Sequence, residues 1–181
     1  MMQLVSQSVK ETLNLGRCIA KYLRQGDIVC LWGKLGSGKT VLTKGIALGL
    51  GIPKDDIISP TFVLIRECQE GKFPLYHFDL YRLDKLSTIA GLGYEEYFYG
   101  EGVSVIEWAD RLKKLLPQEY LKIKLQVRGA QQRKIEISSS GRRYTKLIES
   151  LQGNCHAFII SLKAGDKCVT IKGLKNAYIR H

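Results

Sequence analysis

The residues best suited to chemistry in this sequence form one continuous loop, Gly33-Lys34-Leu35-Gly36-Ser37-Gly38-Lys39-Thr40. The loop fits the pattern G-x-x-x-x-G-K-[ST], in which the backbone N–H groups of a glycine-rich turn surround phosphate oxygens. In this pattern the lysine lies beside the β- and γ-phosphates, and the final hydroxyl binds Mg²⁺. A strand–helix turn without a ligand would not need Lys and Thr directly after its last glycine. The loop therefore predicts a nucleotide site that contains Leu35, Gly36, Ser37, Gly38, Lys39 and Thr40.

The segments on either side of the loop support this interpretation. The apolar run Ile28–Trp32 predicts a buried strand before the loop, and residues 41–50 follow a helical pattern after it. A helix that begins near Lys39 directs the positive end of its dipole toward a bound phosphate. Strand, glycine loop and helix are the context that the pattern requires.

Two acidic residues at the ends of other apolar runs are candidates for the metal. Asp79 follows the run 74–78, and Glu107 follows the run 103–106. Phosphate-loop enzymes use an acid at the end of a neighbouring strand to hold Mg²⁺, directly or through water. The residues alone do not decide which of the two carboxylates contacts the ion.

Three neighbours of these groups are harder to interpret. Thr61 lies in a Ser-Pro-Thr-Phe segment where a nucleotide switch can sense the γ-phosphate. Spacing alone favours a simple turn at Thr61, with Pro60 fixing the bend. For His77, two residues before Asp79, we expect a core or surface residue rather than a proton carrier. For Trp108, directly after Glu107, we expect packing in the core rather than a cover over the site.

The whole chain has 181 residues, which suits one domain, and a net charge of +11. No apolar stretch approaches the roughly twenty residues that a membrane-spanning helix needs. Five cysteines without C-x-x-C spacing predict free thiols in a reducing compartment. We therefore expect a cytoplasmic protein with no membrane contact. Residues 131–181 hold ten Lys or Arg against three acidic residues, so this part predicts either a nucleic-acid or acidic partner or a solvated basic surface.

Further along the chain, the patterns predict an α/β fold. Ser8 and Glu11 form a capping-box pattern before an amphipathic helix that ends near Gly26. Alternation in 120–127 and again around 135–137 predicts an antiparallel hairpin at a sheet edge. Gly153 marks a domain boundary in this interpretation, and 157–162 and 167–172 are expected to form one more hairpin.

Five segments together resemble one protein family. In chain order they are G-K-L-G-S-G-K-T, S-P-T-F, Y-H-F-D-L-Y-R-L, G-Y-E-E-Y-F and V-I-E-W-A-D-R. This combination resembles TsaE, also called YjeE, the ATPase of bacterial threonylcarbamoyladenosine tRNA modification. The resemblance covers about residues 8–151, and the segments around Asp79 and Glu107 are more specific than the phosphate loop.

The resemblance implies a three-layer α/β P-loop NTPase fold with a mostly parallel central sheet and an antiparallel edge hairpin. It implies an ATPase domain over residues 1–152 and leaves 153–181 as a C-terminal extension of unassigned role. ATP and Mg²⁺ are the expected cofactors. The implied roles are catalysis by Lys39, Asp79 and Thr61, metal binding by Thr40 and Glu107, and nucleotide binding by Thr12 and Arg133 in addition to the loop. Thr61 thereby becomes part of a switch-like segment, in contrast to the interpretation from spacing.

The expected partners are the TsaD and TsaB proteins, which transfer threonylcarbamoyl to the adenosine beside the anticodon. In the family, ATP turnover resets that complex. For this chain we expect contact with tRNA, either indirectly through the partners or directly. Among other classes, a small-molecule or nucleoside kinase stays open because Arg142-Arg143 could form its lid. A GTP-driven switch lacks its N-K-x-D segment, and an RNA-binding module lacks an aromatic-rich signature.

Overall fold

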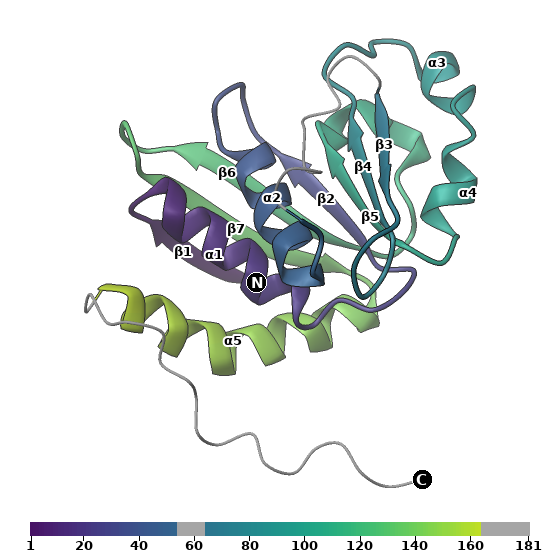
Figure 1. Cartoon of the computed structure of the whole chain (residues 1–181). Helices are drawn as coiled ribbons and strands as arrows, with labels where there is room; N and C mark the ends of the chain where they lie inside the picture. Colours follow the sequence, from purple (N-terminus) through teal and green to yellow (C-terminus); the bar gives the residue numbers. More distant parts are fainter. Residues whose placement is uncertain (54–63, 164–181) are drawn as a thin grey trace, which may run out of the picture.

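A mixed seven-stranded β-sheet forms the centre of the protein in this computed structural model (Figure 1). The structure describes residues 1–53 and 64–163, with side chains as far as residue 152. The strands are β1 (Met2–Ser6), β2 (Ile28–Trp32), β3 (Ile65–Cys68), β4 (Leu75–Asp79), β5 (Val103–Glu107), β6 (Tyr120–Val127) and β7 (Arg133–Ser140). The helices are α1 (Val9–Ala20), α2 (Lys39–Leu50), α3 (Leu86–Ala90), α4 (Tyr94–Phe98), the 3₁₀ helix η2 (Ala109–Leu115) and α5 (Arg142–Lys163).

The sheet order is β1-β7-β6-β2-β5-β4-β3, and its four central strands are parallel. The three outer pairs, β1–β7, β7–β6 and β4–β3, are antiparallel. The prediction of a hairpin between β6 and β7 is confirmed, but its placement at the edge is wrong. β1 lies outside β7 and pairs Met2 with Ile137, so it covers the edge of the hairpin. Sequence reasoning did not predict β1, because it is a short strand without turn signals on either side.

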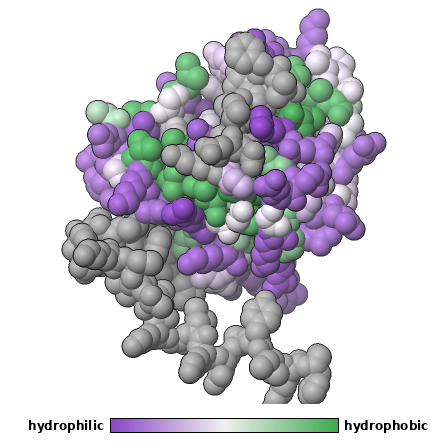
Figure 2. Space-filling view, viewed as in Figure 1, coloured by the Kyte–Doolittle hydropathy of each residue, from purple (hydrophilic) through white to green (hydrophobic). Residues whose placement is uncertain are grey.

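Helices cover both faces of the sheet, which gives three layers. Val29 and Leu31 of β2 belong to one core, which α1, α2 and α5 complete. Ile28 and Cys30 point the other way, into a second core with α3, α4 and η2. This alternation along one strand is the period of two that places successive side chains on opposite faces. In the space-filling view, hydrophilic side chains dominate much of the visible surface, with hydrophobic ones near the middle and at the upper right (Figure 2).

Helices α1 and α2 touch backbone to backbone on the first of these faces. A Cβ added to Gly45 would overlap the backbone carbonyl oxygen of Leu13, and one added to Gly16 would overlap that of Leu42. A Cβ on Gly49 would lie 2.5 Å from the Cβ of Ala20. Three glycines therefore allow the helix that follows the glycine loop to lie directly against α1.

The sequence predicted the start of α1 correctly but not the end of α5. Ser8 caps α1 by accepting a hydrogen bond from the N–H of Glu11, as the capping-box pattern predicts. At the other end, α5 continues through Gly153 to Lys163, so the predicted strand at 157–162 is wrong. A short apolar run does not by itself distinguish a strand from a helix. The partner strand expected at 167–172 lies outside the described residues, and the division into 1–152 and 153–181 stays a prediction.

The expected cytoplasmic location rested on free cysteines and on the lack of a membrane-spanning segment. Cys18 is disulfide-bonded, so the prediction of free thiols is wrong for this residue, whereas Cys30 is a buried free thiol. The cytoplasmic location therefore stays a prediction. In the described part of the chain, no helix has the length and apolar character to cross a membrane.

Candidate functional site

The glycine loop joins the carboxyl end of β2 to the first turn of α2. Gly33 has a φ of 153°, and a Cβ there would lie 2.5 Å from both the Leu125 carbonyl oxygen and the Ser37 hydroxyl. Gly38 is the N-cap of α2 with a φ of 99°, in the left-handed region that favours glycine. No side chain caps α2, so the N–H groups of its first turn are available to an anion.

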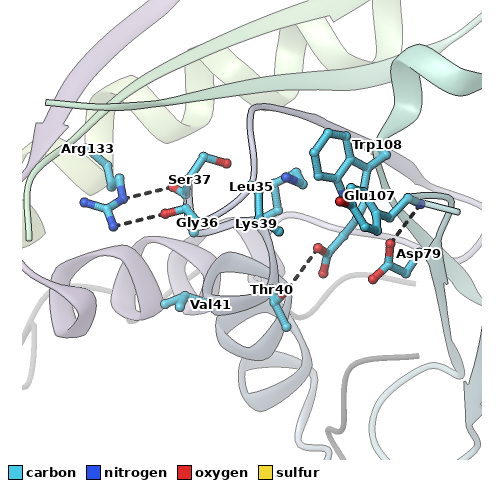
Figure 3. A pocket seen from close by; sticks show the side chains of 12 residues that line it. Leu35, Gly36, Ser37, Lys39, Thr40, Val41, Asp79, Glu107, Trp108 and Arg133 are labelled. Carbon is cyan, nitrogen blue, oxygen red and sulfur yellow. Dashed lines mark hydrogen bonds between the residues drawn. The ribbon is translucent and has the colours of Figure 1, made fainter. Parts of the chain in front are cut away.

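A cavity of about 350 Å³ opens beside this loop at the carboxyl edge of the sheet (Figure 3). This volume is within the range of small-ligand sites. The cavity is lined by Leu35, Gly36, Ser37, Gly38, Lys39, Thr40, Val41, Asp79, Tyr81, Glu107, Trp108 and Arg133. The structure thus brings together the predicted loop residues, both acidic residues and Arg133. Sequence reasoning did not assign Val41 a place in the site, and for Tyr81 it left contact with phosphate and simple packing both open.

Lys39 is held inside the site, with an exposed fraction of 4%. Its Nζ donates to the carbonyl oxygens of Gly33 and Lys34, at 2.8 and 3.1 Å. Burial lowers the pKa of Lys39 below its ordinary value, against an opposing effect of nearby carboxylates led by Glu107. The amine of Lys39 therefore donates to two backbone carbonyl oxygens of the loop. Phosphate oxygens would have to replace these acceptors for the amine to contact a phosphate.

Glu107 is the centre of a buried group of hydrogen bonds. Its Oε2 accepts from the Thr40 hydroxyl at 2.9 Å, and its Oε1 accepts from the Thr43 hydroxyl at 3.3 Å. The Nε2 of His77 lies 2.8 Å from the same Oε1, and both side chains are 2% exposed. As a carboxylate, Glu107 accepts from this nitrogen, which assigns the proton to Nε2. His77 is a core residue, as expected, but it also orients an acidic residue of the site, which sequence reasoning missed.

Asp79 lies beside Glu107 because β4 and β5 are parallel neighbours that pair these two residues in register. Its Oδ1 accepts from the backbone N–H of Tyr81 at 3.1 Å, and its side chain borders the cavity. The described geometry puts Glu107, rather than Asp79, in contact with Thr40 (Figure 3).

Arg133 supports the loop from the first residue of β7. Its Nε and Nη2 donate to the carbonyl oxygens of Ser37 and Gly36, each at 3.1 Å (Figure 3). In a trans peptide the carbonyl and the following N–H point in opposite directions. The N–H of Gly38 therefore faces away from Arg133, so this side chain helps to set the direction of the loop amides.

Thr12, one of the two remaining predicted residues, does not line the cavity. Thr12 is 2% exposed, and its hydroxyl lies 2.7 Å from the hydroxyl of Ser6. Its methyl group lies behind Gly38, at 3.9 Å from the position of an added Cβ. Nucleotide binding by Thr12 stays a prediction. Thr61 lies outside the described residues.

Trp108 corrects an expectation, because it covers the site rather than only filling the core. Its ring lies 3.8 Å from the Nζ of Lys39 and 4.9 Å from the Tyr81 ring. The backbone of Trp108 has a φ of 60°, an uncommon value for a residue other than glycine. This conformation is not recognisable in the sequence, which explains why the direction of the side chain was not predicted.

Fold and site together define an α/β protein whose glycine loop, helix terminus and paired carboxylates surround one cavity. The family model described as "Threonylcarbamoyl adenosine biosynthesis protein TsaE" matches residues 6–135. The chain belongs to the TsaE family. The resemblance inferred from the five segments is confirmed.

Relatives and a solved structure agree with this assignment. A TsaE protein of Bacillus subtilis is 43% identical over 142 residues, which are 78% of this chain and 88% of the relative. One of Treponema pallidum is 41% identical over 137 residues, which are 76% of this chain and 100% of the relative. Both are described as tRNA threonylcarbamoyladenosine biosynthesis proteins. The crystal structure of Bacillus subtilis YdiB superposes with a TM-score of 0.73 at 38% identity, covering 83% of this chain and 93% of the other.

Proposed function

We propose that this chain is a P-loop ATPase that binds and hydrolyses ATP with Mg²⁺ and supports threonylcarbamoylation of tRNA adenosine together with TsaB and TsaD proteins. The observation that carries the proposal is the contact between Thr40 and Glu107 in the lining of the glycine-loop cavity. The family membership supplies the pathway, since homologous TsaE proteins take part in tRNA threonylcarbamoyladenosine biosynthesis.

The oxygen atoms of Thr40 and Glu107 fit a magnesium ion. Two oxygens at adjacent corners of an Mg²⁺ octahedron, each about 2.05 Å from the ion, lie about 2.9 Å apart. The Thr40 Oγ1 and the Glu107 Oε2 are 2.9 Å apart. A hydroxyl and a carboxylate are also the hard oxygen ligands that Mg²⁺ prefers. When bound, the ion would neutralise charge on the phosphates.

The other residues of the cavity divide the remaining tasks. The amides of the loop and of the first turn of α2 would bind the phosphates, and Lys39 would neutralise charge on the transferred group. Asp79 would act near the γ-phosphate, with its carboxylate held by the Tyr81 amide. Trp108 would exclude water from Lys39, since its ring lies over the amine.

Phosphate release from Mg²⁺-ATP, measured with and without TsaB and TsaD, tests the proposed function. We expect hydrolysis that the partners stimulate, and tighter binding of ATP than of GTP in competition titrations. Transfer of the γ-phosphate to a small acceptor in place of hydrolysis would instead favour a kinase. Clearly tighter GTP binding would contradict the choice of nucleotide.

Exchanging the two acidic residues for amides should separate metal binding from turnover. Because Glu107 contacts Thr40 directly, Glu107→Gln should weaken Mg²⁺-dependent ATP binding, by about tenfold or more. Asp79→Asn should lower turnover more than binding, since Asp79 has no described contact with Thr40. Calorimetry measures binding and phosphate release measures turnover. If Asp79→Asn abolished Mg²⁺-ATP binding and Glu107→Gln did not, the two roles would be exchanged.

His77 should act as a positioning residue for Glu107. Removal of its hydrogen bond in His77→Leu should raise the Mg²⁺ concentration for half-maximal ATPase activity by about tenfold, while saturating Mg²⁺ restores most of the turnover. His77→Gln keeps an N–H donor and should show a smaller shift. An equal loss in both variants that Mg²⁺ does not restore would assign His77 to packing alone.

A further inference from the structure

A second cavity, of about 270 Å³, lies at the edge of the sheet opposite the glycine loop. It lies near the amino end of β2, whereas the loop follows the carboxyl end, so the five-residue strand, about 16 Å long, lies between them. Three segments distant in sequence form it: the chain after α1, the β3–β4 turn and the first half of α5. The lining residues are Lys21, Tyr22, Leu23, Arg24, Lys72, Arg143, Lys146, Leu147 and Ser150.

Five of these nine residues are positively charged and none is acidic. Arg143 is fixed in the cavity, because its Nη2 donates to the Asp27 carboxylate at 2.6 Å and to the Tyr22 carbonyl oxygen at 2.9 Å. Arg24, Lys72 and Lys146 are exposed, and within the described residues they have no carboxylate at salt-bridge distance. Like charges that converge in this way repel one another, so an anion in the cavity would relieve the repulsion.

The size of the cavity and the charge of the chain narrow the class of anion. A volume of about 270 Å³ is below the range of about 300–1,000 Å³ that is usual for drug-sized ligands, so a phosphate group fits better than a whole nucleotide. The chain as a whole carries +11 and has a pI near 9.5, which favours a polyanion over a single small ion.

We propose that this basic cavity binds backbone phosphates of RNA, and that tRNA contacts the protein directly at the sheet edge opposite the nucleotide site. Arg143 forms the fixed floor of the cavity, and Arg24, Lys72 and Lys146 reach the phosphates as long, flexible donors. RNA is preferred to an acidic peptide because phosphates spaced along a chain match several separate cations. Proteins of the TsaE family take part in tRNA modification, so tRNA is the RNA we expect at this cavity. Binding there does not depend on ATP hydrolysis.

Two charge-matched triple variants of the full chain test this proposal. The first neutralises the cavity with Arg24→Gln, Lys72→Gln and Lys146→Gln. The control removes the same charge elsewhere with Lys10→Gln, Lys85→Gln and Lys114→Gln, which are also exposed. Fluorescence anisotropy with an unmodified tRNA transcript measures the affinity of each protein over a series of salt concentrations.

The cavity variant should lose about tenfold or more in tRNA affinity at about 0.1 M salt, and its salt slope should fall by about two to three. The control variant should lose less than about threefold, because only its long-range attraction changes. An equal loss in both variants, no loss in either, or no tRNA binding by the unaltered chain overturns the proposal. Unchanged tRNA affinity with weaker binding to TsaB and TsaD would show an acidic protein segment as the occupant, which also contradicts it.

Thermal unfolding and phosphate release from ATP distinguish a specific loss of tRNA binding from misfolding and from a loss of ATPase activity. Both variants should unfold at nearly the temperature of the unaltered chain, since all six side chains are exposed. Both should keep its ATP turnover, because none of the six lines the nucleotide cavity. A chain that binds tRNA at this cavity but fails to hydrolyse ATP would contradict the proposed ATPase and leave the RNA site supported.

Discussion

Replacement of Lys39 by alanine is expected to lower ATP turnover by about 10²–10³-fold, the effect typical of removing a donor that meets developing charge. The amine is buried against the loop carbonyls and under the Trp108 ring, so solvent cannot supply an equivalent charge there. The same change removes the loop contacts of the amine, so ATP affinity should also fall. Phosphate release in the presence of the partner proteins, and calorimetry with Mg²⁺-ATP, measure the two effects.

Lys44→Ala is the matched control for this prediction. Lys44 lies on the same helix, α2, but does not line the glycine-loop cavity. It should therefore keep both turnover and affinity close to those of the unaltered chain. If Lys39→Ala kept full activity, or if both alanine variants lost activity equally, the assignment of the site to the glycine loop would be wrong.

Gly45→Ala is expected to give the largest loss of stability among simple substitutions in the described core. Its new Cβ would overlap the backbone carbonyl of Leu13, which cannot move without shifting α1. Overpacking of this kind lowers the free energy of unfolding by about 3 kcal/mol or more. The higher helix propensity of alanine raises it by only about 1 kcal/mol. At about 2–4 °C per kcal/mol for a chain of this size, the melting temperature should fall by several degrees, on the order of 5–10 °C.

Gly91→Ala provides the comparison, since it is another glycine at a helix. Gly91 has a φ of −70°, and the nearest atom to an added Cβ is the Ser87 carbonyl oxygen at 3.4 Å, an ordinary contact. Its stability should change by less than about 0.5 kcal/mol. Calorimetric melting of both variants measures how much the close helix contact limits substitution at Gly45. Similar melting temperatures for the two would contradict the backbone overlap.

Much of the fold could be predicted because its strands follow simple patterns. The buried run of β2 and the alternation of β6 and β7 are local signals, and the capping of α1 by Ser8 is another. β1 could not be predicted, because its place depends on pairing with β7, more than one hundred residues away. The continuation of α5 through Gly153 was missed because glycine weakens a helix without necessarily ending it.

Site residues could be predicted where the residue type alone determines the chemistry. They could not be predicted where the role of a residue depends on the direction in which its side chain points. The loop, Asp79 and Glu107 follow from a motif and from strand ends, and the structure places all of them at one cavity. The orientation of His77 toward Glu107 arises from the pairing of β4 with β5. Trp108 reaches Lys39 through an unusual backbone angle, for which the sequence contains no signal.

The contact of α1 with α2 limits how the protein can move. Gly16, Gly45 and Gly49 leave no layer of side chains between the two helices, so neither can slide or roll without a backbone collision. The two helices are therefore expected to move together as one rigid body, because closely packed backbones have few alternative arrangements. A rearrangement on exchange of ATP for ADP would then be carried by the opposite wall of the cavity, where Trp108 leads into η2. Time-resolved tryptophan fluorescence from that wall would report the motion, while a distance probe between the two helices would stay constant.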